Sequence, residues 1–149
     1  MKKKVTWIIV ADGTRAQLLA NDGPGKGLRP AIAREFHHDA PPTHLLGTDK
    51  PGRVAPSVGT NRSAIEPHMD WHEFEKEKFG QEMARLLNDA ADRNSYDDLI
   101  VVAPARTLST LRQSLSAKAS ELIRAELAKD LTHVPLQEMP KHLGNVIAL

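Results

Sequence analysis

Two apolar runs near the start of the chain, in the stretch VTWIIVADGTRAQLLAND, are separated by Asp12-Gly13-Thr14. Both runs are rich in residues that favour strands, and an Asp-Gly pair tolerates the positive φ angles of a tight type I′ turn. The pattern therefore predicts a β-hairpin. A secretion signal behind the lysines at residues 2–4 is the alternative, but it requires a longer unbroken apolar run, and Asp12 and Arg15 interrupt this one.

The next segment, LRPAIAREF at residues 28–36, alternates well enough to predict a third strand. From His37 to about Pro67 the sequence has no sustained periodicity, and it contains several prolines and glycines. A loop of this length inside a compact domain is usually functional or disordered. We therefore expect a long flexible loop over about residues 37–67.

Helical spacing returns after Pro67 and continues to Asn94-Ser95, where the helix is expected to end. An apolar stripe marks the side that packs on the core. Its members are Phe79, Met83, Leu86, Leu87 and Ala90, and Trp71 and Phe74 extend it toward the start of the helix.

The run Leu99 to Ala103 is apolar on both faces, as in a central strand that is covered on both sides. Two helices are expected after Pro104, separated near Ser114 to Ser116. The first carries the stripe Leu108, Leu111 and Leu115, and the second carries Ala119, Leu122, Ile123 and Leu127. A short piece between Pro135 and Pro140 is expected to add one or two helical turns. This order predicts an α/β fold: one domain over residues 1–149, with a mixed β-sheet and packed helices.

Composition narrows the functional classes. The chain has 149 residues, which suit one domain, and no cysteine, which excludes disulfides and thiolate metal sites. Its net charge of +1 neither requires nor excludes nucleic acid. The absence of a signal and of a long apolar stretch predicts a cytoplasmic protein with no membrane partner. GPGKG at residues 23–27 lacks the full spacing and the trailing Ser/Thr of a phosphate loop. No cofactor is expected.

Three segments in this order, WIIVADGTRAQLL, FGQEMARLLNDAADRNSYDDLIVVAPARTLSTLRQSL and ELAKDLTHVP, resemble the bacterial host attachment protein family, described as proteins required for attachment to host cells. That family is similar to the middle domain of archaeo-eukaryotic peptide-chain release factors. The resemblance implies a compact α/β domain with a mixed sheet and a long loop before the first major helix. In release factors this loop carries the Gly-Gly-Gln motif of peptidyl-tRNA hydrolysis. The motif is absent here, where Gly59 to Ser63 stand in roughly its place, so we do not expect that reaction.

The loop contains a basic stretch. Between Asp49 and Ala64 the cations are Lys50, Arg53 and Arg62, and Asp49 is the only acid. The planar arginine fork suits phosphate, and nearby glycines allow close approach of the backbone. Together with the resemblance, this predicts RNA binding by Lys50, Arg53, Asn61 and Arg62, with the ribosome or tRNA as partner. The alternative is an ordinary solvated loop with scattered charges.

Histidines form the other candidate sites. His68 and His72 are four residues apart, so they share one helix face and predict a metal site. A third ligand would have to come from the loop, and without one these are two surface histidines. A second cluster, also open to a general acid–base role, consists of His37, His38, Asp39 and His44.

The leading hypothesis is a cytoplasmic, release-factor-like domain that contacts the ribosome or tRNA and affects host attachment indirectly. A metal-dependent hydrolase using the loop and helix histidines is one alternative. A surface adhesion protein, which takes the family description literally, is the other. The sequence does not indicate an oligomeric state.

Overall fold

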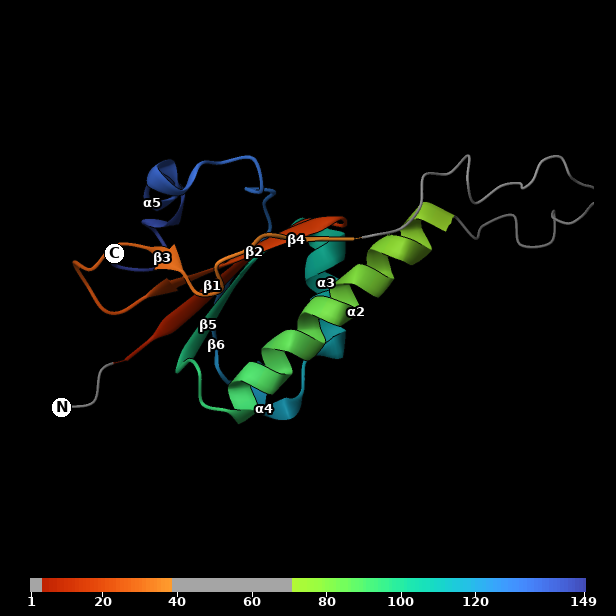
Figure 1. Cartoon of the computed structure of the whole chain (residues 1–149), viewed down its shortest axis with the longest axis horizontal. Coiled ribbons are helices and arrows are strands. Elements are labelled where there is room, and N and C mark those ends of the chain that lie inside the picture. The colour runs from red at the N-terminus through yellow and green to blue at the C-terminus, as the bar shows by residue number, and fades with distance from the viewer. Residues whose placement is uncertain (1–3, 39–70) are drawn as a thin grey trace, which may run out of the picture.

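The computed structural model describes residues 4–38 and 71–149. One mixed sheet has the strand order β3-β2-β1-β5-β6, and β4 also pairs with β2 (Figure 1). The strands are β1 (Thr6–Ala11), β2 (Arg15–Asn21), β3 (Arg29–Pro30), β4 (Phe36–His37), β5 (Asp98–Val102) and β6 (Ile123–Leu127). The helices are α2 (Trp71–Asp92), α3 (Ala105–Ser114), α4 (Ala117–Glu121), the 3-10 helix η2 (Leu136–Glu138) and α5 (Met139–Leu143). The α/β fold with a mixed sheet is confirmed.

The first hairpin is confirmed, because β1 pairs antiparallel with β2 from Thr6↔Asn21 to Ala11↔Ala16. Its predicted type I′ turn is wrong, since positive φ angles in the described chain occur elsewhere. Instead, Asp12 Oδ1 accepts the amides of Thr14 and Arg15 at 2.8 and 2.9 Å. The aspartate side chain supplies the acceptor that closes the turn, so no left-handed residue is needed.

The third strand predicted over residues 28–36 is confirmed only near its two ends. Only two short strands of two residues each, β3 and β4, join the sheet there, and both pair with β2. Residues 33–35 are all exposed. Ala31 and Ile32 pack partly against the core, but the exposed residues 33–35 gain little from a continuous ladder.

The predicted central strand is confirmed as β5, which lies between β1 and β6 and runs parallel to both. Helices α2 and α3 cover one face of the sheet, and the C-terminal segment with η2 and α5 covers the other (Figure 1). On the first face the core includes Ile9, Leu99, Val101, Phe79, Leu87 and Leu111. On the second face it includes Ile8, Ile100, Val102, Met139 and Leu143.

Helix α2 ends where the sequence predicts. Asn94 adopts a left-handed conformation with φ 58°. The amides of Asn94 and Ser95 donate to the carbonyls of Ala91 and Ala90 at 3.0 and 2.9 Å. These bonds satisfy the last carbonyls of the helix, and asparagine is among the few residues that tolerate this conformation.

The second helix predicted after Pro104 is largely wrong. Helix α4 stops after five residues, and the chain continues as β6. The amide of Leu99 donates to Leu122 O at 2.8 Å and that of Ala103 to Leu127 O at 3.1 Å. The free edge of β5 supplies partners at a distance in sequence, and this pairing overrides a weak local helix preference.

Within residues 4–38 and 71–149, no helix combines the length and the apolar character needed to cross a bilayer.

Candidate functional site at the carboxyl ends of the parallel strands

The carboxyl ends of β1, β5 and β6 meet at one end of the sheet, because these strands are parallel. A cavity of about 600 Å³ opens there, a size typical of small-ligand sites. We call it the carboxyl-end cavity. Its lining residues are Asp12, Gly13, Thr14, Glu73, Phe74, Lys76, Glu77, Pro104, Arg106, Thr107, Thr110 and Asp130. In open α/β sheets, ligands bind preferentially at this end of the strands.

Two glycines allow α2 to pack closely at this end. A Cβ atom on Gly13 would lie 2.6 Å from Cγ and Cδ of Lys76, so the lysine stem packs directly over the β1–β2 turn. A Cβ atom on Gly80 would lie 2.8 Å from Cγ2 of Thr110 on α3. Any side chain at Gly13 or Gly80 would therefore displace Lys76 or Thr110, both of which line the cavity.

Asp12 forms part of the cavity floor as an ionised carboxylate. Burial pushes the pKa of Asp12 upward, but hydrogen bonds from the amides of Thr14 and Arg15 and from the Thr132 hydroxyl outweigh it and hold the pKa below the ordinary 3.8. Thr132 Oγ1 lies 3.2 Å from Asp12 Oδ2 and 2.5 Å from Asp130 Oδ1. A hydroxyl has one hydrogen, so only one of the two carboxylates receives it at a time.

The cavity lining carries excess negative charge. Four carboxylates (Asp12, Glu73, Glu77 and Asp130) face two cations (Lys76 and Arg106). Both cations pair with Glu73: Arg106 Nη1 lies 2.8 Å from Glu73 Oε1, and Lys76 Nζ lies 3.5 Å from Glu73 Oε2. Within the described residues, Glu77 and Asp130 are left without an ion pair.

Phe74 lines the cavity, and the Trp71 ring lies next to the Phe74 ring. The prediction that both belong to the buried stripe is wrong. They are 47% and 44% exposed, and they are the exposed large apolar side chains of the described chain. Their ring centroids are 5.6 Å apart, with an angle of 35° between the planes. The buried stripe of α2 starts at Phe79, because the first turns of the helix project beyond the sheet (Figure 1).

His38 anchors the end of β4 to α2. Its Nε2 atom lies 2.5 Å from Glu75 Oε1, and both side chains are nearly buried. Its amide donates to Thr14 O at 2.8 Å. His37 instead is exposed and pairs with Glu35 at 3.0 Å. The structure thus separates these two members of the predicted histidine cluster.

The remaining predicted site residues fall mostly outside the described residues. These are Asp39, His44, Lys50, Arg53, Asn61, Arg62 and His68. His72 lies exposed in the first turn of α2. In the described ranges, no group of three potential ligands is placed to hold a metal ion. The RNA-binding residues and the His68–His72 metal site stay predictions.

Sequence reasoning missed Asp12, Asp130 and the exposed aromatic pair. A usable signal existed, because Asp12 directly follows a predicted strand and parallel strands end together. Asp130 could not be found in this way, because residues 123–127 were predicted to be helical and not to be a strand that ends beside β5.

A family model described as "Protein required for attachment to host cells" matches residues 7–143. "Uncharacterized protein RP470" of Rickettsia prowazekii (strain Madrid E) is 26% identical over 90 residues, and the match covers 59% of this chain and 60% of that protein. The chain thus spans about three fifths of the length of this curated relative.

Two solved structures are similar to the chain, each at 15% identity. "Archaeal protein" has a TM-score of 0.49, over 97% of this chain and 35% of that one. An archaeal translation termination factor, aRF1, has a TM-score of 0.45, over 95% of this chain and 38% of that one. Because both TM-scores are below 0.5, neither similarity says what this chain does.

Proposed function

The chain belongs to the family of proteins required for attachment to host cells, whose model spans residues 7–143, and from this premise we propose that it serves attachment indirectly, by contacting RNA. The partner is the ribosome or tRNA in the cytoplasm. Arg53 and Arg62 contact phosphates, with Lys50 beside them and Asn61 as a further polar contact.

The contact between His38 and Glu75 is the observation that supports this proposal. His38 directly precedes segment 39–70, and Glu75 lies in the first turns of α2, which directly follows it. The contact therefore joins the two sides of that segment. The described residues on either side of segment 39–70 therefore lie at the same end of the sheet, next to the carboxyl-end cavity. A segment anchored in this way loses less conformational entropy on binding than one with free ends.

The charge of the segment favours phosphate as its target. Three cations and one acid lie between residues 49 and 64, whereas the whole chain is nearly neutral at +1. Arginine binds phosphate through two parallel hydrogen bonds. Such contacts release counterions from nucleic acid, so binding should weaken as salt increases.

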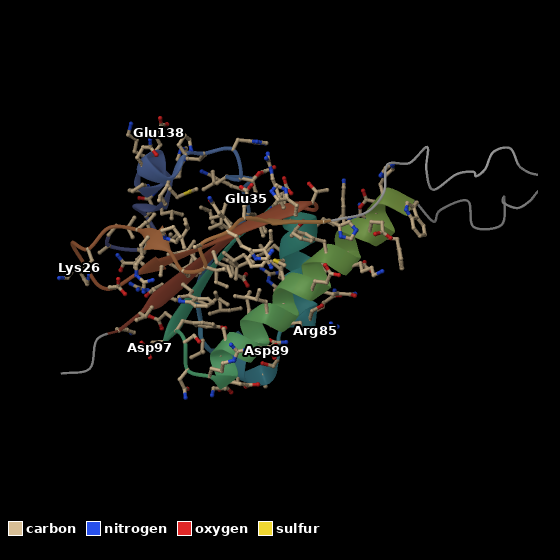
Figure 2. The ribbon with its side chains drawn as sticks, in the orientation of Figure 1. Lys26, Glu35, Arg85, Asp89, Asp97 and Glu138 are labelled. Carbon is tan, nitrogen blue, oxygen red and sulfur yellow. The ribbon has the colours of Figure 1, made fainter. Side chains whose placement is uncertain are left out.

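Co-sedimentation with ribosomes on sucrose gradients, at low and moderate salt, tests the proposal. We expect salt-sensitive association of the wild-type chain and its loss in Arg53→Ala/Arg62→Ala. The control Arg85→Ala/Arg93→Ala removes the same charge from exposed positions: Arg85 lies within α2 (Figure 2), and Arg93 directly follows its last residue. The proposal would be contradicted if the wild-type chain associated with ribosomes at neither salt concentration. It would also be contradicted if the control variant lost as much association as Arg53→Ala/Arg62→Ala.

The family description taken literally gives a competing outcome. A surface adhesion protein would be labelled on intact cells by a reagent that does not cross membranes, whereas a cytoplasmic RNA-binding protein would be labelled only after lysis. A metal-dependent hydrolase would purify with stoichiometric metal and would gain thermal stability on addition of zinc or manganese.

A further inference from the structure

The aromatic pair Trp71–Phe74 and the carboxyl-end cavity form one continuous surface. Phe74 lines the cavity, and Trp71 stacks on Phe74. Exposing two large rings side by side is unfavourable in water, and such exposed apolar groups commonly mark an interaction site. We propose that this surface binds a basic peptide segment of a partner protein and takes one lysine or arginine side chain into the cavity.

The distribution of charge selects a cation. Arg106 and Lys76 both pair with Glu73, so part of their positive charge is already compensated within the chain. Glu77 and Asp130 have no ion pair within the described residues, and both line the cavity. An entering ammonium or guanidinium group finds two carboxylates, whereas a phosphate would meet an excess of negative charge.

The rings suit the rest of such a side chain. Lysine and arginine carry a charged head on an apolar stem, and the stem packs on apolar surface while the head keeps its polar partners. A cation near an aromatic face is attracted by the ring, and this attraction adds to the charge pairing inside the cavity. Trp71 and Phe74 cover the stem, and Glu77 and Asp130 receive the head.

This site is distinct from the RNA contact proposed above, so each stands or falls by its own experiment. The chain as a whole carries a net charge of +1 and does not attract a polycation by total charge. Binding of a basic peptide therefore requires a local acidic site.

Fluorescence anisotropy of a labelled oligoarginine peptide, titrated with the full chain, tests the inference. We expect saturable binding that weakens about fivefold in Glu77→Gln/Asp130→Asn, as the loss of two exposed charge pairs implies. Trp71→Ala/Phe74→Ala should weaken it by a similar factor. Trp71 emission should change on binding, whereas Trp7 is 8% exposed and should contribute little to the change.

The control Glu121→Gln/Glu138→Gln removes the same charge from exposed positions on α4 and η2, and it should bind like wild type (Figure 2). Circular dichroism confirms that each variant is folded. Three results would overturn the inference: no binding by wild type, equal weakening in the control, or binding of labelled oligouridylate that is lost in Trp71→Ala/Phe74→Ala.

Discussion

The two ends of the parallel strands differ in how their polar groups are satisfied. At the amino end, the Val5 amide donates to Asp97 Oδ2, and the Asp97 amide donates to Val5 O, both at 2.8 Å. Asp98 pairs there with Lys4 at 3.2 Å and with Arg124 at 3.8 Å. At the carboxyl end there are instead a cavity, two carboxylates that form no ion pair with any described residue, and two exposed rings.

This difference assigns separate roles to the two ends. An end whose polar groups are paired inside the chain contributes to stability and offers little to a partner. An end that leaves charges and rings unpartnered contributes less to folding and retains capacity for binding. Substitutions at the amino end should therefore lower the free energy of unfolding, and those at the carboxyl end should mainly weaken binding.

The largest effect is expected for Leu99→Ala, near the start of β5. Leu99 is completely buried, so its truncation leaves a cavity in the core and should lower the free energy of unfolding by about 2–5 kcal/mol. Urea denaturation followed by circular dichroism measures the change. A loss below about 1 kcal/mol would mean that this end is packed more loosely than described.

Asp97→Ala should cost about 1.5–3 kcal/mol, because the Val5 amide loses a charged acceptor. Asp97→Asn keeps an oxygen acceptor in place and serves as the matched variant. Its loss in the same urea experiment should be clearly smaller. Equal losses would show that the charge of Asp97, and not its hydrogen bond, stabilises this end.

Tyr96 should make the protein sensitive to alkali. Burial, with a smaller contribution from the Asp92 charge, raises the pKa of Tyr96 from 10.0 to about 12. The folded state therefore favours the neutral phenol. Its contribution is complete below pH 10 and is lost as the pH rises toward 12, by up to about 2 kcal/mol.

Tyr96→Phe is the variant that isolates this contribution. It loses the hydrogen bond to Leu87 O, so it should be less stable than wild type at neutral pH by about 1 kcal/mol. It should also lose less stability between pH 10 and 12. Identical alkaline slopes for the two proteins would contradict the assignment.

Asp12→Asn should have a smaller effect, of about 1 kcal/mol at neutral pH, because the turn keeps one side-chain acceptor. The pKa of Asp12 is lower in the folded chain than its ordinary 3.8. The carboxylate therefore stabilises the fold above that pH, and the contribution is lost as the pH falls through the folded value. Thermal unfolding at pH 7 and pH 3 should show the difference between wild type and variant narrowing in acid.

The smallest effect is expected for Trp71→Ala/Phe74→Ala, which should change the free energy of unfolding by less than about 0.5 kcal/mol for each residue. Both rings are substantially exposed, and they lie against each other. If this variant lost as much free energy of unfolding as Leu99→Ala, the two rings would be part of the core and the two ends of the sheet would not differ as described.

Periodicity in the sequence correctly predicts those elements whose apolar pattern lies entirely within their own residues. The hairpin, the strand β5 and the helix α2 follow from alternation, from a run apolar on both faces and from helical spacing. It failed at β6, because that strand forms on the edge of β5, a partner about 25 residues away that local spacing does not reveal.

The candidate site was harder to predict for the same reason. Asp130 reaches the cavity only because β6 is a strand, and the stripe through Trp71 and Phe74 is helical in spacing but extends beyond the sheet that would bury it. The turn at Asp12 depends on a side-chain acceptor, whereas the Asp-Gly pair suggested backbone angles.

Hydrogen–deuterium exchange of the full chain, with and without purified ribosomes, tests most directly the claim that the carboxyl end is the binding end. The account predicts slower exchange in residues 50–63 when ribosomes are present, and unchanged exchange in residues 95–98 at the amino end. Slower exchange confined to residues 95–98, or no change in either region, would contradict it.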